Sequence, residues 1–334
     1  MFRHRINGAV LAVTAVALVL TFAACGDLSV AKLSANYHFA KANRFFTENQ
    51  YRKAITEYDL CLKNNPNMIQ AYRFLGESYK QLYKPGVNIA DNLDKKNKAL
   101  DALNKAYEIE PNNKDIIYSL GDMYDKLRDF PKAEKLYLRI LELEPANMSN
   151  YYVLAEFYKR YAGENKDAAR KAESMYLRRI EGDPENPQGY AYMAAYLESL
   201  QSSDPGRQLS LYDEALTYRD RIIALQPNSA EAYTAKGINL WSHAFRFAFL
   251  SSEQRLSLAM ESEKALRKAV SLDANYPEPH SWLSVLYKST LAKLEPEKEA
   301  RYNADGDKEM ERYQELRKRI AERKKLEEEL KKTG

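Results

Sequence analysis

The sequence predicts an all-α protein with an α-solenoid architecture, in which helical hairpins stack one on the next. The main observation is a recurring pattern: an alanine, usually an aromatic residue four positions later, a third residue three later, and a proline five after that. Three copies are Ala54-Tyr58-Cys61-Pro66, Ala133-Tyr137-Ile140-Pro145 and Ala172-Tyr176-Arg179-Pro184, while Ala99-Leu103-Ala106-Pro111 and Ala215-Arg219-Ile222-Pro227 keep the spacing with weaker residues. The second observation is a composition with 12 glycines, 12 prolines and 29% charged residues, which is typical of a helical protein. Repeats of one spacing indicate units that bury their apolar faces by stacking.

The N-terminus has the features of an export signal. Arg3 and Arg5 precede an uncharged apolar run of 14 residues, Ala9 to Phe22, and small residues follow. The run is shorter than the roughly 17–25 residues of a membrane span, and the order basic, apolar, small is that of a secretory signal.

The segment Ala23-Ala24-Cys25 resembles the lipobox of bacterial lipoproteins, although Phe22 stands where that family usually has leucine. The resemblance implies a signal peptide at 1–24, lipidation of Cys25 and a lipid-anchored linker at 25–34. It also implies a location in the bacterial envelope, facing the periplasm. Gly26 lacks the charge of an inner-membrane retention aspartate, which favours the outer membrane. The alternative is an ordinary signal peptide cut nearby, with Cys25 incidental.

Each closing proline is followed six residues later by the first marker of a second amphipathic segment. Two such sets are Tyr72, Leu75-Gly76 and Tyr79, and Ile117, Leu120-Gly121 and Tyr124. Together with the alanine-to-proline pattern, they resemble tetratricopeptide repeats, in which a helix A and a helix B form each hairpin. The resemblance implies a right-handed superhelix over 35–294. Its six hairpins are 35–68, 69–113, 114–147, 148–186, 187–229 and 230–276, and a capping helix A follows from Pro277 to about Leu294.

All variation in repeat length falls between helix A and helix B. This gap is nine residues from Phe45 to Ala54 and from Tyr124 to Ala133, and it grows to 22 from Leu240 to Ser262. Insertions along one edge either mark a binding face or are tolerated, since added loop length costs little. The polar stretch 88–98 is expected to be a loop. Four apolar residues of the last gap should pack on the sixth hairpin or contact a partner: Phe245, Phe247, Phe249 and Leu250.

The last segment, 295–334, is predicted to be a charged helical extension. Asp305-Gly306 should break the chain, and 307–332 interleaves Lys and Arg with Glu, as in a solvated helix. Because the net charge is only +4, we expect no nucleic-acid partner.

No catalytic or cofactor motif is evident. The four histidines are scattered, no glycine-rich phosphate loop occurs, and no Cys or His spacing suits a metal. We therefore predict that the chain is not an enzyme and binds neither metal nor cofactor. Cys61 occupies the small-residue position of the first repeat and is expected to be a packing residue.

The tetratricopeptide resemblance implies a concave groove lined by exposed positions of helix A. Aligned on the repeats, these positions are Phe39, Asn43, Arg73, Glu77, Tyr118, Asp122, Tyr152 and Glu156. Aromatic rings beside charges suit an extended or helical peptide, and the alternative is an ordinary hydrated surface. Phe39 and Glu77 depart from the basic cluster with which the family's chaperone-tail binders hold a terminal carboxylate.

The leading hypothesis is a lipid-anchored envelope scaffold that binds a protein or peptide partner. Pilotins of type IV pilus secretins and components of outer-membrane protein assembly are family members of this kind. One alternative is a periplasmic ligand-binding or sensing module. Another is an enzyme whose site lies in the inserted loops.

Overall fold

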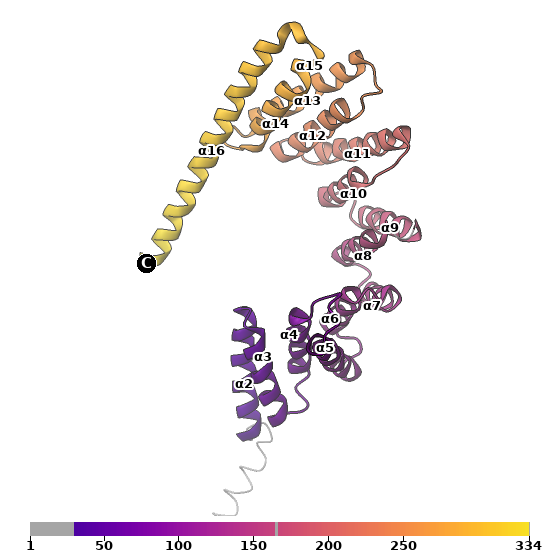
Figure 1. The fold of residues 1–334 in the computed structure, drawn as a ribbon, viewed down its shortest axis with the longest axis vertical. Helices are drawn as coiled ribbons and strands as arrows, with labels where there is room; N and C mark the ends of the chain where they lie inside the picture. Colours follow the sequence, from indigo (N-terminus) through magenta and orange to yellow (C-terminus); the bar gives the residue numbers. More distant parts are fainter. Residues whose placement is uncertain (1–29, 164–165, 334) are drawn as a thin grey trace, which may run out of the picture. The chain divides into compact units, whose positions relative to one another are not determined.

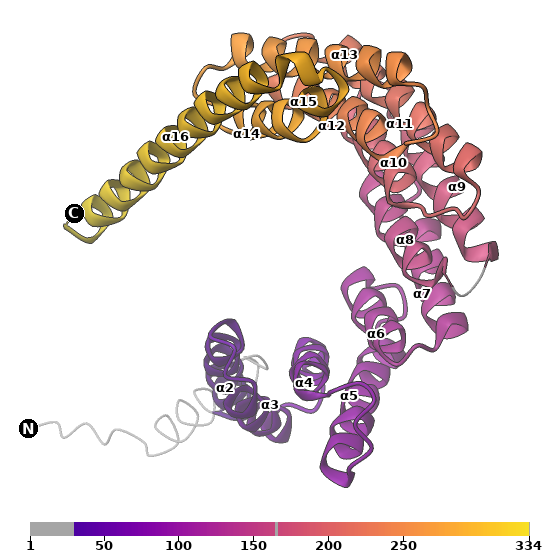
Figure 2. The ribbon, with the colours of Figure 1, turned by 45° about the horizontal axis from the view of Figure 1, so that its top comes forward.

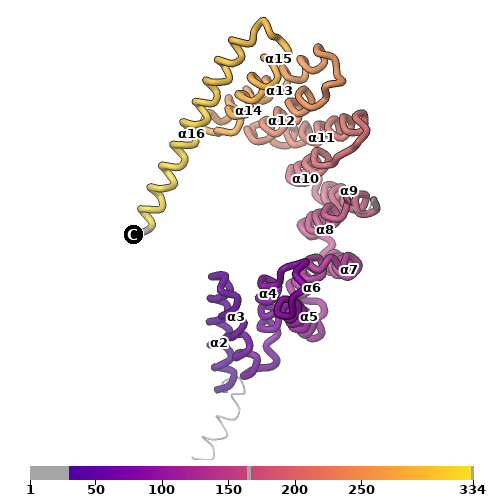
Figure 3. The backbone as a smooth tube through the Cα atoms, viewed as in Figure 1, coloured from indigo at the N-terminus to yellow at the C-terminus, as the bar shows by residue number. Residues whose placement is uncertain are grey.

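The computed structural model describes residues 30–163 and 166–333, and these residues form helices with no strand among them. The predicted signal peptide and Cys25 lie outside the described residues. The fold class is the predicted one, because helices alternate in antiparallel pairs with short connections (Figures 1 and 3). The helices belong to two compact units, the first ending at Asn150 and the second beginning at Tyr151.

The first unit contains three hairpins. Their bounds are α2 (Val30–Thr47) with α3 (Tyr51–Asn64), α4 (Ile69–Leu82) with α5 (Ala90–Ile109), and α6 (Lys114–Lys126) with α7 (Phe130–Leu143). The first helix begins at Val30, within the segment that the sequence assigned to a linker. Cys61 is buried as expected, with its Sγ 3.2 Å from Met68 Sδ.

The second unit contains the remaining predicted hairpins and an end cap. The hairpins are α8 (Met148–Tyr161) with α9 (Lys166–Gly182), α10 (Pro187–Ser199) with α11 (Pro205–Leu225), and α12 (Ala230–Arg246) with α13 (Ser252–Leu272). The predicted capping helix is α14 (Glu278–Leu286), continued by the π-helix η1 (Tyr287–Leu291) and α15 (Ala292–Leu294). A 3₁₀ turn, η2 (Pro296–Lys298), leads into α16 (Glu299–Thr333).

Glycine in the Leu-Gly pairs allows helices A and B to approach closely. A Cβ atom at Gly76 would lie 2.6 Å from Leu103 Cγ, and one at Gly237 would lie 2.7 Å from Leu266 Cγ. Both leucines are fully buried. The recurring glycine is therefore a packing requirement, which outweighs its poor helix propensity of about 1 kcal/mol.

The A–B insertions are largely ordered helix. In the two shortest turns, Asn49 and Arg128 adopt left-handed backbone angles, with φ of 59° and 60°. The expected loop at 88–98 is instead the start of α5 from Ala90 onward. It is fixed by the buried Asn92, whose side chain bonds to the Lys84 amide at 2.9 Å and to the Val87 carbonyl at 2.7 Å. The Gln208 side chain at the start of α11 likewise accepts a hydrogen bond from the Ser202 amide and donates one to the Leu200 carbonyl.

The last helix corrects the prediction for the C-terminus. α16 runs unbroken through Asp305 and Gly306, and its first half packs on α14 instead of being solvated (Figure 2). Tyr302, Glu309 and Leu316 are buried, whereas the residues from 317 to 331 are all exposed. The first half of α16 thus covers the final helix-A surface, as the end of a repeat stack requires.

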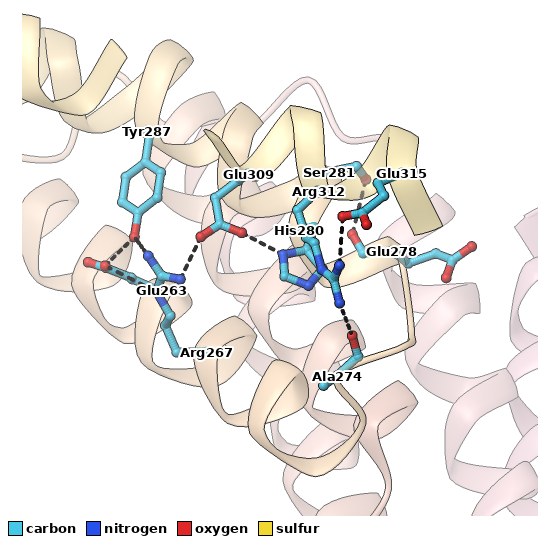
Figure 4. Close-up of polar contacts among 10 residues, drawn as sticks. All are labelled: Glu263, Arg267, Ala274, Glu278, His280, Ser281, Tyr287, Glu309, Arg312 and Glu315. Atoms are coloured by element: carbon cyan, nitrogen blue, oxygen red, sulfur yellow. Dashed lines mark hydrogen bonds and ion pairs between the residues drawn. The ribbon is translucent and has the colours of Figure 1, made fainter. Parts of the chain in front are cut away.

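A buried polar cluster joins α16 to α13 and α14 (Figure 4). The Glu309 carboxylate lies 2.5 Å from His280 Nδ1 and accepts a 2.6 Å hydrogen bond from Arg267. Arg267 also donates to the Tyr287 hydroxyl at 2.7 Å, and that hydroxyl donates to Glu263. The Glu309 carboxylate thus links α16 to residues of both α13 and α14.

Candidate partner-binding surface

The predicted groove positions lie on the first helix of four hairpins, α2, α4, α6 and α8, and we call this side of the helices, in each unit by itself, the helix-A face. Six of the eight positions belong to the first unit, on α2, α4 and α6. Tyr152 and Glu156 belong to the second unit, on α8. The two parts are therefore described separately.

The first hairpin contributes mainly packing to this surface. Phe39 is half-buried, with its ring 6.0 Å from that of Tyr58 and 6.3 Å from that of Phe74. The Asn43 side-chain oxygen accepts a 2.7 Å hydrogen bond from the Tyr58 hydroxyl. Both residues join helices A and B, so neither offers a fully free side chain.

The charged positions of α4 and α6 pair with each other across the two hairpins. The Arg73 guanidinium lies 4.3 Å over the Phe74 ring and 3.6 Å from the Asp115 carboxylate. Further along α4, the Lys80 ammonium lies 2.7 Å from Glu77 and also pairs with Asp122 of α6. The predicted charges of the helix-A face are thus largely neutralised within the chain.

Lys80 was not predicted from the sequence, yet it is the centre of this charged network. It is 4% exposed. Burial lowers its pKa, but the charges of Glu77 and Asp122 outweigh burial and leave the pKa raised. Lys126 donates a 2.7 Å hydrogen bond to the Lys80 carbonyl, and burial, with the Lys80 charge, lowers the pKa of Lys126. The same register of the next three hairpins also holds charged residues, Asp125, Lys159 and Glu198, so nothing in the sequence singles out Lys80.

Tyr118 is the predicted groove residue that remains substantially open. It is 46% exposed, and its ring centre is 6.0 Å from that of Tyr137 on α7. Tyr118 therefore presents an exposed aromatic ring that packs on the ring of Tyr137.

In the second unit, Tyr152 and Glu156 belong to an aromatic cluster. Tyr152 stacks on Tyr192 of α10 with ring centres 4.0 Å apart, and the Arg179 guanidinium lies 5.3 Å from the Tyr192 ring centre. Glu156 accepts a hydrogen bond from the Tyr176 hydroxyl. Burial, together with the Glu156 charge, raises the pKa of Tyr152. Tyr192 and Arg179 were not among the predicted site residues.

A notch of about 300 Å³ lies between α10, α11 and α12. Ala191, Ile222 and Ala235 form much of its apolar lining, and Arg219 and Gln188 add polar groups. Ala191 follows the first marker of its helix, the same register as Arg73 and Tyr118. A small residue there leaves space where the second, third and fourth hairpins have Arg73, Tyr118 and Tyr152.

The apolar residues at the end of α12 and in its connection to α13 differ in how deeply they are buried. Phe247 is 5% exposed and packs its ring 5.6 Å from that of Tyr212 on the fifth hairpin. Phe245 and Phe249 are exposed, and Phe245 stacks on Trp241 with ring centres 5.1 Å apart. Phe247 also lies 5.8 Å from the His243 ring of α12, so packing on the sixth hairpin is confirmed for Phe245 and Phe247.

The described residues include no group of His, Cys, Asp and Glu side chains that could hold a metal ion. None of the described helices is long and apolar enough to cross a membrane. The described histidines are engaged with carboxylates: His38 with Glu57 at 2.7 Å, His243 with Asp213 at 3.2 Å, and His280 with Glu309.

Comparison with known proteins agrees with this arrangement of hairpins. Residues 97–156 match the model of the tetratricopeptide repeat family. No curated protein matches the chain. The C-terminal part of a TPR repeat-containing protein from Cytophaga hutchinsonii is 12% identical with a TM-score of 0.54, over 83% of this chain and 95% of that one.

Two further solved structures are similar at lower TM-scores. A tetratricopeptide repeat protein from Parabacteroides merdae is 12% identical with a TM-score of 0.46, over 85% of this chain and 93% of that one. YrrB, described as a TPR protein with an unusual peptide-binding site, is 21% identical with a TM-score of 0.36, over 60% of this chain and 90% of that one. Residues 97–156 thus match the tetratricopeptide repeat family, and the described helices share the hairpin-stack fold of the Cytophaga structure.

Proposed function

We propose that this protein is a lipid-anchored scaffold of the bacterial envelope that binds a protein or peptide partner through its helix-A face. The observation that carries the binding role is the exposed aromatic surface at Tyr118, together with the Tyr152–Tyr192 stack. Rigid aromatic rings provide contact area at a low cost in conformational entropy. Tetratricopeptide stacks commonly serve binding, which is why we propose a scaffold and not an enzyme.

The pairing of charges defines what kind of partner this surface would take. Because Arg73, Glu77 and Asp122 already have partners within the chain, they add little net charge to attract a strongly charged peptide. The rings and the apolar notch at Ala191 then dominate recognition. The proposed partner is an amphipathic segment that places aliphatic or aromatic side chains against these sites.

The partner experiment compares two variants of the helix-A face in the full-length protein. Tyr118→Ala and Tyr152→Ala should each weaken capture of the same envelope protein by about tenfold, as expected for aromatic anchors of an interface. Leu138→Ala, an exposed change on α7, is the matched control and should leave capture unchanged. Equal capture by all variants would argue against the helix-A face. A thermal shift with a small periplasmic ligand and none with peptides would favour the sensing role instead.

The anchoring part of the proposal rests on the lipobox resemblance around Cys25. Cys25→Ala should release the protein from the membrane fraction and abolish the gel-mobility change that lipidation causes. Retention in the membrane fraction with unchanged mobility would refute the anchor but would leave the proposed partner binding standing. The choice between a pilotin-like role and a role in outer-membrane assembly would follow from the captured protein.

A further inference from the structure

A second candidate surface lies on the sixth hairpin, away from the helix-A face. It is a groove of about 550 Å³ lined by Tyr233, Lys236, Glu261, Lys264, Ala265 and Lys268. Its lining residues come from α12 and α13. The Lys236 ammonium lies 2.6 Å from the Asp220 carboxylate of α11.

The groove has an excess of positive charge. Asp220 is the partner of Lys236, which leaves Glu261 as the one carboxylate of the lining beside two further lysines. Lys264 and Lys268 stand one helical turn apart on α13 and are exposed. Neither forms an ion pair with any residue that the structure describes. Two adjacent exposed lysines therefore line the same groove without a direct ion pair, and Glu261 is the nearest carboxylate of the lining.

The same groove in another hairpin lacks this charge pattern. In the second hairpin, a groove of about 370 Å³ has Tyr72 in the register of Tyr233, and Lys98 and Asp101 in the registers of Glu261 and Lys264. There Lys98 is paired with Asp94 at 2.9 Å. The groove thus arises from repeat packing, whereas its charge differs between the second and the sixth hairpins.

We propose that this groove binds an acidic peptide segment of a protein partner. Carboxylates one helical turn apart on that segment would match the spacing of Lys264 and Lys268. The half-buried Tyr233 supplies apolar contact within the groove. A concave groove admits a peptide chain more readily than it admits the flat layer of headgroups on an anionic membrane.

The test measures the fluorescence anisotropy of a labelled oligoglutamate peptide with the folded protein at low salt. Wild type should bind, and added salt should weaken binding through screening. Lys264→Glu/Lys268→Glu should reduce affinity by about tenfold, because each exposed ion pair is worth little and reversal adds repulsion of similar size. Lys264→Gln/Lys268→Gln, which removes charge without repulsion, should give a smaller loss.

The control variant changes the same charge elsewhere: Lys324→Glu/Lys331→Glu on the exposed part of α16 should bind the peptide as wild type does. Absence of wild-type binding, or equal loss in the two reversal variants, would overturn the proposal. Lysine-dependent binding to phosphatidylglycerol vesicles without peptide binding would overturn it in favour of an anionic lipid surface. Tyr118→Ala should leave peptide binding intact, which separates this proposal from the role of the helix-A face.

Discussion

The hydroxyl of Tyr58 on α3 donates a 2.7 Å hydrogen bond to the side-chain oxygen of Asn43 on α2. The tyrosine is fully buried, whereas Asn43 is only partly so. The same relation links Tyr176 to Glu156 in the fourth hairpin. The helix-B aromatic of the repeat pattern therefore does more than fill space, since it holds a polar residue of the helix-A face.

Removing the donor and removing the acceptor of this hydrogen bond should lower the free energy of unfolding by different amounts. Tyr58→Phe should lower the free energy of unfolding by about 1 kcal/mol, because water can still reach Asn43. Asn43→Ala should cost about 2 kcal/mol, because it leaves the buried hydroxyl without an acceptor. Urea unfolding of both single variants and of the double variant measures the coupling. Strictly additive losses would mean that the hydrogen bond contributes nothing.

Two glycine substitutions should move stability in opposite directions. Gly237→Ala forces a Cβ atom against the buried Leu266 and should cost about 1–3 kcal/mol through overpacking. Gly306→Ala meets only the Lys288 side chain, which is partly exposed and can move. It should be neutral or stabilising by up to about 1 kcal/mol through helix propensity. Thermal unfolding of the two variants decides the matter, and a stabilising Gly237→Ala would contradict the packing role.

The protein should lose stability in alkali because its buried tyrosines resist ionisation. Burial, with the Glu173 charge, raises the pKa of Tyr196 from 10.0 to about 12. A raised pKa means that the folded state retains protons that the unfolded state releases. This contribution is complete below pH 10 and is lost as the pH rises towards 12.

Tyr196→Phe tests that contribution directly. It removes a 2.9 Å hydrogen bond to the Ala169 carbonyl and should cost about 1 kcal/mol at neutral pH. Its unfolding midpoint in urea should nevertheless fall less steeply above pH 10 than that of wild type. Parallel pH profiles would show that Tyr196 ionises equally easily in both states.

The buried Glu309 should control the docking of α16. Glu309→Gln removes the charge that both His280 and Arg267 contact, and we expect a loss of about 2 kcal/mol. Amide hydrogen exchange should then accelerate over 299–316. Glu322→Gln, on the exposed half, should change stability by less than about 0.5 kcal/mol. Unchanged exchange in Glu309→Gln would show that apolar contacts of Tyr302 and Leu316 suffice.

Much of the fold could be predicted because the repeat markers are local packing signals. Leu75-Gly76 and the closing prolines indicate where helices meet and where they end, and the hairpins follow these boundaries. The expected break at Asp305-Gly306 was wrong, since these residues continue a helix that other contacts stabilise. Gly306 faces the flexible Lys288 side chain, whereas Gly76 is held against the buried Leu103.

The binding surface was harder to predict, because exposure depends on pairs that come from different hairpins. Arg73 and Asp122 look like free groove charges in the sequence, but Asp115 and Lys80 neutralise them in the fold. Arg179 departs from the small or aliphatic residue of its repeat position, but only the fold shows that it and Tyr192 lie beside Tyr152. Sequence register places a residue on a face but does not show which residue of the next hairpin meets it.

The most direct test of the proposed role is site-specific photo-cross-linking in intact cells. A photoreactive phenylalanine analogue replaces Tyr118 or Tyr152 on the helix-A face in one set of strains, and Leu60 or Leu138 on helices α3 and α7 in another. The account predicts one discrete cross-linked partner from the helix-A positions and none from the other two. Cross-links to that partner from Leu60 or Leu138 alone would contradict the claim that the helix-A face is the binding surface.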